Sequence, residues 1–195
     1  MEGLKISIPD LLVKALAQAL SKHLLFNSTL EEDKILLLSE ININLAVALE
    51  AGLLVVPVIH NANKKSLVQV ARRSLELIKA AHANRLKLED VTGGTFTLTI
   101  TGMYGSMFGT PKIFPPQSAI LAIGAIAEKP IVKEGKIAIG SLMPLSLTYD
   151  HRITGGAEAN QFLQTLSRLI SNPDEIDLGL DVDLGLDVDM NVQSH

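Results

Sequence analysis

The stretch Thr148-Tyr149-Asp150-His151-Arg152-Ile153-Thr154-Gly155-Gly156-Ala157-Glu158-Ala159 places a histidine between an aspartate and an arginine, and a pair of glycines follows. Residues 141–147 before this stretch predict a buried strand, and residues 157–170 carry apolar side chains at helical spacing. We therefore expect His151 at a strand-to-helix junction, where the two glycines permit positive φ and close backbone approach. A lone histidine is usually a hydrogen-bonded structural residue, but an imidazole that titrates near neutral pH can also act as a base.

The composition indicates one folded domain. Of the 195 residues, 47% are apolar and 19% are charged, which allows a sizeable core and argues against general disorder. No apolar run reaches the roughly 18 residues needed to span a bilayer, and residues 1–5 lack the pattern of a signal or transit peptide. The absence of cysteine excludes a disulfide, a thiolate nucleophile and a thiolate metal site. We expect a cytoplasmic protein with no membrane partner and no metal.

The net charge of −4 is unevenly distributed along the chain. No Lys or Arg follows Arg168, and seven of the 21 acidic residues lie in the tail, residues 174–195. Residues 1–173 therefore carry 17 basic and 14 acidic side chains, a net charge of +3. Nucleic-acid binding favours a dense basic face with aromatic side chains for stacking, so we expect no nucleic-acid partner.

Capping and periodicity signals predict a mixed α/β or α+β domain. Ser7 and Pro9 signal the start of a helix to about residue 24, apolar nearly all round and hence buried. Asn27 begins a predicted turn, and a second helix, whose apolar stripe includes Leu75, is expected from about residue 66 to 86. Strands are expected at 34–39, 41–49, 53–59, 95–101, 119–126, 130–133 and 137–147, the one at 53–59 either buried on both faces or central in the sheet. Glu134-Gly135 is expected to form a hairpin turn between the last two strands. Together they predict a mixed β-sheet flanked by helices in one domain.

The tail contains the clearest internal repeat, Leu-Gly-Leu-Asp-Val-Asp at 178–183 and again at 184–189. Even positions are apolar and odd positions are Gly or Asp, a period of two that is typical of a strand. The segment could add a strand to a partner, insert into a neighbouring subunit, or fray as a terminus. Its Asp-x-Asp spacing makes calcium binding a further, weaker alternative, because the sequence contains no EF-hand loop.

Several segments resemble one family, the 2-oxoacid dehydrogenase acyltransferases, which are dihydrolipoamide acyltransferase (E2) cores. They occur in family order from about residue 6 to 173: Leu-Val-Val-Pro at 54–57, Gly-Gly-Thr-Phe-Thr at 93–97, Phe-Gly-Thr-Pro at 108–111, Pro-Pro-Gln at 115–117 and Leu-Thr-Tyr-Asp-His-Arg at 147–152. The resemblance implies a chloramphenicol-acetyltransferase-like fold, assembled as homotrimers or multiples of three with active sites between subunits. It divides the chain into a catalytic core, 1–173, that lacks the N-terminal part of the family core, and a tail, 174–195.

The resemblance also implies catalytic roles for two residues. His151 occupies the position of the base that takes the thiol proton from coenzyme A or dihydrolipoamide. Thr99 occupies the position of a serine whose hydroxyl donates to the oxyanion. Arg152 either assists the loop and substrate phosphates or pairs with Asp150, and we favour the ion pair.

Further positions follow from the same resemblance. Thr110, Pro115 and Pro116 are expected to shape the coenzyme A channel, while Met103 and Phe108 either line it or belong to the core. Where the family usually has an aspartate that pairs with an arginine from an N-terminal segment, this chain has Gly155.

The expected function is acyl transfer between dihydrolipoamide and coenzyme A, in the core of a 2-oxoacid dehydrogenase complex. Its partners would be copies of itself, a chain or domain that carries the lipoyl group, and the other subunits of the complex. The location would be a bacterial or archaeal cytoplasm, or the mitochondrial matrix for a fragment. Gly155 and the missing N-terminal segment leave one alternative: an acyltransferase-like assembly subunit with impaired catalysis.

Overall fold

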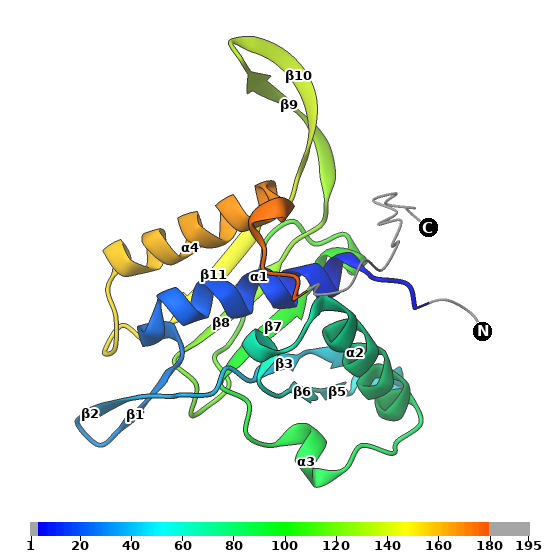
Figure 1. Cartoon of the computed structure of the whole chain (residues 1–195), viewed down its shortest axis with the longest axis vertical. Helices are drawn as coiled ribbons and strands as arrows, with labels where there is room; N and C mark the ends of the chain where they lie inside the picture. Colours follow the sequence, from blue (N-terminus) through cyan, green and yellow to red (C-terminus); the bar gives the residue numbers. More distant parts are fainter. Residues whose placement is uncertain (1–3, 180–195) are drawn as a thin grey trace.

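A five-stranded mixed sheet organises the computed structural model, which describes residues 4–179 (Figure 1). The strand order is β11-β8-β7-β3-β6. The central strands β3, β7 and β8 are parallel, and the two edge strands are antiparallel to their neighbours. The bounds are β3 Ile43–Leu45, β6 Val58–Ile59, β7 Phe96–Ile100, β8 Ala119–Ile123 and β11 Leu145–Tyr149. This confirms the expected mixed sheet.

Four α-helices accompany the sheet among the described residues: α1 Ile8–Lys22, α2 Leu67–His82, α3 Leu88–Val91 and α4 Gly156–Ser171. The predicted start of α1 is confirmed, because Pro9 lies in its first turn and the Ser7 N–H donates to Asp10 Oδ2 at 2.9 Å. The Ser66 hydroxyl accepts from the Gln69 N–H at 3.2 Å and caps α2. Short 3₁₀ turns occur at Leu24–Phe26, Glu50–Gly52, Ala62–Lys64, Gly102–Tyr104 and Pro173–Glu175.

The two faces of the sheet differ in chemistry because side chains alternate along each strand. In β7, Phe96 and Leu98 are fully buried toward the helices, and the Phe96 ring lies 6.1 Å from that of Phe162 on α4. Helices α1 and α4 lie side by side over this apolar face (Figure 1). Thr97 and Thr99 alternate with these residues and point to the opposite face, where Thr97 is buried and Thr99 is half-buried.

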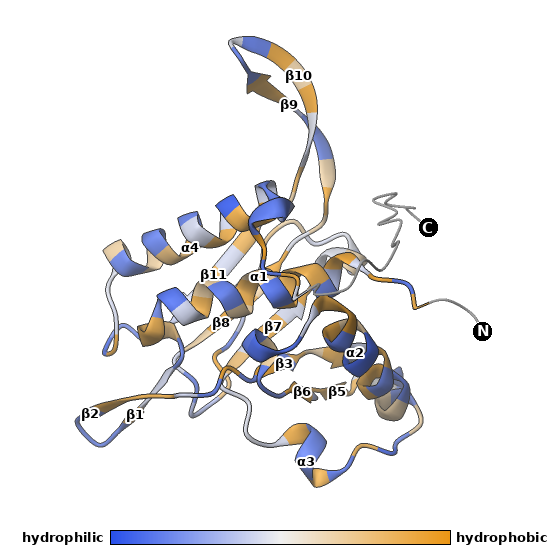
Figure 2. Cartoon of the chain, in the orientation of Figure 1, coloured by the Kyte–Doolittle hydropathy of each residue, from blue (hydrophilic) through white to orange (hydrophobic). Residues whose placement is uncertain are grey.

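Three two-stranded hairpins extend from this body. They are β1 Ser28–Glu31 with β2 Lys34–Leu37, β4 Val47–Ala48 with β5 Leu54–Val55, and β9 Ala127–Lys133 with β10 Lys136–Leu142. The predicted turn at Glu134-Gly135 is confirmed, with positive φ at both residues. The β9–β10 hairpin stands clear of the body and carries exposed apolar residues (Figure 2).

Several predicted element boundaries are wrong. The predicted strand 137–147 is two strands, β10 and β11, because Pro144 at the break has no N–H for a sheet ladder. The predicted turn at Asn27 leads directly into β1, and the run 41–49 divides into β3 and β4. Pro57 interrupts 53–59: Val58 and Ile59 are buried, but Leu53 and Leu54 are each 64% exposed. On α2 Leu77 is buried, whereas Leu75, expected in the apolar stripe, is exposed.

The chain continues to pack against the body beyond the expected domain boundary at residue 173. Ile176 is buried, and the Leu178 carbonyl accepts from the Leu67 N–H at 2.8 Å, at the start of α2. Gln18 on α1 donates to the Glu175 carbonyl at 3.0 Å and accepts from the Asp177 N–H at 2.8 Å. Most of the tail repeat, from residue 180 on, lies outside the described residues. Within 4–179, no helix has the length and hydropathy to cross a membrane.

Candidate active site

His151 lies on the tight turn that joins β11 to α4, as predicted. The Asp150 N–H donates to the Ser118 carbonyl at 2.8 Å, and the Asp150 carbonyl accepts from Ile153 at 3.0 Å and Thr154 at 3.3 Å. The imidazole is exposed, with its ring centre 5.4 Å from that of Tyr149. A rigid turn therefore presents the imidazole at the surface, where a substrate or another subunit can reach it.

The neighbours of His151 form an ion pair across this turn. Arg152 donates to Asp150 through Nε at 3.0 and 3.1 Å and through Nη2 at 2.6 Å. The Asp150 side chain is 19% exposed, and these hydrogen bonds lower the pKa of its carboxyl, with partial burial acting in the opposite direction. The Arg152 N–H also donates to Asp150 at 2.9 Å. Asp150 and Arg152 therefore pair with each other on either side of His151, and the Arg152 side chain is held within the turn.

Thr99 and His151 do not meet within one chain. Thr99 aligns with Ala122 of β8, which aligns with Ser146 of β11, so Thr99 lies two strands, about 10 Å, from β11. The strand then continues three residues to Tyr149, about 10 Å further along, before the turn begins. Among residues 4–179, no hydrogen bond joins the two side chains.

The five expected channel residues lie on the long connection between β7 and β8. Thr110, Pro115 and Pro116 are exposed, and the peptide bond between the two prolines is cis. Met103 is 74% and Phe108 72% exposed, so the core reading of these two residues is wrong within one chain. Exposed apolar groups on one connection suit a surface that another molecule covers.

A buried amide network at Thr97, two residues before Thr99 on β7, was not predicted from the sequence. Gln117, 7% exposed, accepts from Thr97 Oγ1 at 2.6 Å and donates to Asn44 Oδ1 at 3.0 Å and the Gly94 carbonyl at 3.1 Å. A Cβ on Gly94 would lie 1.6 Å from Asn44 Oδ1, so a glycine is needed there. The only sequence signal was the family segment at 115–117, which carries no information about partners so distant along the chain.

Gly155 is the N-cap residue of α4. Its backbone is extended, and a Cβ placed on it would lie 3.0 Å from Glu158 Oε2. The Glu158 carboxylate, from the first turn of α4, therefore lies next to position 155, where the family usually has an aspartate.

Two of the cavities formed by residues 4–179 contrast in chemistry, and His151 borders neither of them. An apolar cavity of about 290 Å³ is bordered by residues of α1, α4 and the start of the β9–β10 hairpin, including Leu11, Ile126 and Ile170. A more polar cavity of about 430 Å³ is bordered by the β1–β2 hairpin and by Asn42 and Gln117. No cluster of three or more His, Asp or Glu side chains suited to a metal occurs within residues 4–179.

The fold and the exposed histidine turn match one class of protein. The sequence model of the 2-oxoacid dehydrogenases acyltransferase family (catalytic domain) matches residues 1–178. The chain belongs to this family.

Curated relatives agree with this assignment. The chain is 40% identical over 180 residues to the mitochondrial dihydrolipoyllysine-residue succinyltransferase component of the 2-oxoglutarate dehydrogenase complex of Bos taurus, covering 91% of this chain and 39% of the relative. It is 38% identical over 169 residues to the dihydrolipoyllysine-residue acetyltransferase component of the Rickettsia felis pyruvate dehydrogenase complex, covering 87% of this chain and 41% of the relative. The chain thus spans about two fifths of the length of these relatives.

Solved structures share the architecture. A probable dihydrolipoamide acetyltransferase from Listeria monocytogenes superposes with a TM-score of 0.84 at 39% identity, covering 87% of this chain and 72% of that chain. Azotobacter vinelandii dihydrolipoamide acetyltransferase gives 0.85 at 34% identity, covering 89% and 72%. A chloramphenicol acetyltransferase gives 0.54 at 18% identity, covering 84% and 78%, which confirms the expected fold.

Proposed function

We propose that this chain is an acyltransferase core that moves an acyl group between dihydrolipoamide and coenzyme A. The observation that carries the proposal is His151, exposed on a braced turn in a chain of this family. The curated relatives are named as dihydrolipoyllysine-residue acyltransferase components of 2-oxoacid dehydrogenase complexes. By analogy, its partners would be a lipoyl-bearing domain or chain and the other subunits of such a complex, in a bacterial cytoplasm or the mitochondrial matrix.

Sequence spacing supports the two catalytic residues. The Azotobacter vinelandii structure accompanies work on a serine, a histidine and an asparagine in that enzyme's catalytic mechanism, with 52 positions from serine to histidine and four from histidine to asparagine. Here Thr99 precedes His151 by 52 positions, and Gly155 follows it by four. A hydroxyl and an imidazole therefore recur at the same separation, whereas the amide is absent.

The proposed chemistry is thioester exchange. The His151 imidazole takes the proton from the thiol of coenzyme A as its sulfur attacks the carbonyl carbon of the acylated lipoamide. The Thr99 hydroxyl donates to the tetrahedral oxyanion. When the intermediate collapses, the bond to the lipoamide sulfur breaks, and that sulfur takes the proton back from the imidazolium. The acyl group then resides on coenzyme A.

We propose that Thr99 of one subunit faces His151 of another. Two strand spacings and an offset along the sheet separate the residues within a chain, which is too far for one reaction centre. A homotrimer, or a multiple of three, would bring them together and cover the exposed apolar side chains. Each subunit would then supply both halves of different sites.

Three substitutions test this function in the full chain. His151→Ala should lower coenzyme-A-dependent acyl transfer to dihydrolipoamide by roughly 10²- to 10⁴-fold, since it removes the base. Thr99→Val should cost on the order of 10²- to 10³-fold by removing the oxyanion donor at nearly constant shape, whereas Thr99→Ser should retain activity.

Circular dichroism and light scattering serve as controls for the folding and the assembly of each variant. An unaltered chain without transfer above background would indicate the assembly-subunit alternative. Full activity in folded His151→Ala would disprove the mechanism.

A further inference from the structure

Gln117 connects the segment before β8 to two sheet strands, β7 and β3, through one buried amide. It lies directly after the cis Pro115-Pro116 bond and two residues before β8 begins. Its side-chain oxygen accepts from Thr97 of β7, and its nitrogen donates to Asn44 of β3 and to the Gly94 carbonyl. Asn44 in turn donates to the Val56 carbonyl at 3.2 Å. The amide therefore ties the connection that carries the expected channel prolines to two sheet strands.

This network acts on the strand that carries Thr99. Thr97 and Thr99 are two residues apart on β7, so their side chains share one face. Asn44 aligns with Thr97 across the β3–β7 pair, and Thr97 aligns with Ile120 on β8. The Thr97 hydroxyl donates to Gln117 at 2.6 Å, and this hydrogen bond fixes the position of β7 within the sheet. The fixed point lies two residues before Thr99.

The network has little freedom to rearrange. Thr97 and Asn44 are each 2% exposed, so their side chains depend on buried hydrogen-bond partners and not on bulk water. Gly94 packs against the Asn44 side chain so closely that no Cβ fits between them. Because an oxyanion donor works only at hydrogen-bond distance, a shift of about 1 Å in its position can cost about 10²-fold in rate.

We infer that Gln117 is a positioning residue for the oxyanion donor Thr99. The inference rests on the proposed function, in which Thr99 touches the reacting carbonyl. Gln117 itself touches no substrate; it holds β7 in place through the Thr97 hydroxyl. A purely structural amide would instead contribute to stability without any selective effect on Thr99.

A double-mutant cycle separates these two roles. Turnover and the KM for coenzyme A are measured for the full chain, for Gln117→Met, for Thr99→Val and for the double variant. Gln117→Met removes all three hydrogen bonds at similar volume and should lower kcat by about 10- to 100-fold, with KM changed only a few-fold. In the Thr99→Val background the same substitution should cost less than about threefold, since there is no donor left to misplace.

Two further variants refine the test. Thr97→Val should behave like Gln117→Met, while Thr97→Ser keeps the hydroxyl and should keep kcat. Val70→Ala, in the buried face of α2, is the control for a general loss of packing. Its effect on kcat should be the same in the unaltered chain and in the Thr99→Val background.

A readout independent of activity is the Thr99 methyl signal in a ¹H–¹³C spectrum of the assembled protein. It should shift in Gln117→Met and Thr97→Val and stay unchanged in Val70→Ala. An unmoved signal, or equal kcat losses in both Thr99 backgrounds, overturns the inference. If the unaltered chain is inactive yet the signal shifts, the positioning of Thr99 stands and the proposed function fails.

Discussion

At the scale of single residues, Gly155 is the main departure from the site of the Azotobacter vinelandii relative. Its φ of −105° and ψ of 179° are accessible to any residue type, so conformation does not require a glycine. The nearest atom to an added Cβ is Glu158 Oε2, the mobile end of a flexible side chain. A larger residue is therefore expected to fit without loss of fold.

The space available at position 155 makes Gly155→Asn an informative substitution. The substitution returns an amide four residues after His151, where the Azotobacter enzyme has the asparagine investigated for its catalytic role. We expect faster acyl transfer than in the unaltered chain, measured as kcat at saturating coenzyme A. Gly155→Ala is the matched control, since it adds a Cβ without an amide. Equal rates for the two variants would show that the missing amide does not limit acyl transfer by this chain.

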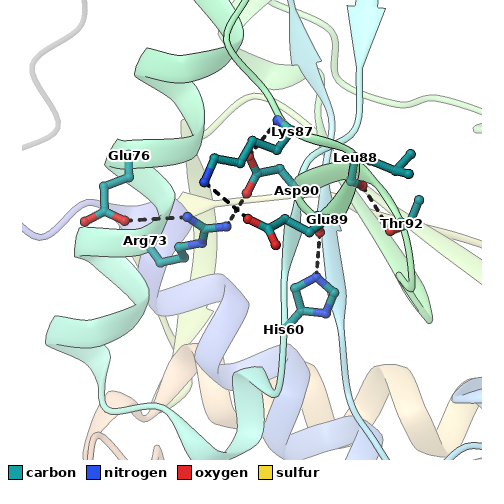
Figure 3. A network of polar contacts seen from close by, with 8 residues as sticks. All are labelled: His60, Arg73, Glu76, Lys87, Leu88, Glu89, Asp90 and Thr92. Carbon is teal, nitrogen blue, oxygen red and sulfur yellow. Dashed lines mark hydrogen bonds and ion pairs between the residues drawn. The ribbon is translucent and has the colours of Figure 1, made fainter.

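At the scale of elements, the short helix α3 is held to α2 by Asp90 (Figure 3). Its carboxylate accepts from the Lys87 N–H at 2.9 Å and pairs with Arg73, which also lies 3.6 Å from Glu76. His60 Nε2 lies 3.0 Å from the Glu89 carbonyl and joins β6 to the same helix. The Lys87 N–H is the main cause that lowers the pKa of Asp90; Arg73 adds to it, and burial opposes it.

This arrangement predicts a stability that depends on pH. Because the folded pKa of Asp90 is below its ordinary value of about 3.9, ionised Asp90 stabilises the fold above that pH, and the contribution is lost as pH falls through the folded pKa. Asp90→Asn should lower the free energy of unfolding by about 1–3 kcal/mol at pH 7. Urea unfolding at fixed protein concentration should show the gap to the unaltered chain shrinking toward pH 3. An undiminished gap would mean that the charge is not involved.

At the scale of the whole molecule, the β9–β10 hairpin offers one apolar face that stays exposed among the described residues, 4–179. Ile137 aligns with Val132, and Ile139 lies two residues further along the same face; the three are 84%, 76% and 78% exposed. Such a hairpin is marginally stable in water by itself, so contacts with a second molecule would stabilise it. We take this face to be part of the proposed contact between subunits.

We therefore expect a smaller assembly when Ile137 and Ile139 are both replaced by serine. Multi-angle light scattering should show the Ile137→Ser, Ile139→Ser chain at lower mass than the unaltered chain, and acyl transfer should fall because each proposed site is built from two subunits. Lys133→Ser with Lys136→Ser, a pair in register beside the same turn, is the control and should leave the mass unchanged. An unchanged mass in the isoleucine variant would assign the hairpin another role.

Local sequence determined much of the individual elements. Three local features depend only on hydrogen bonds and backbone angles within a few residues. They are the start of α1 at Ser7–Pro9, the turn at Glu134-Gly135 and the junction that carries His151. Such signals do not require knowledge of the fold. They fail where a single proline divides an apolar run, as Pro57 and Pro144 do, because periodicity alone ignores a missing N–H.

The arrangement of the site was decided by tertiary structure. Gln117 bonds to Asn44, 73 positions away, and no local pattern encodes which strands become neighbours or which face of β7 the helices cover. Sequence alone determined that this chain would present a histidine turn and a hydroxyl-bearing strand. Only the folded sheet shows that the two lie apart within one chain, because strand order and register, which set their separation, arise from long-range packing.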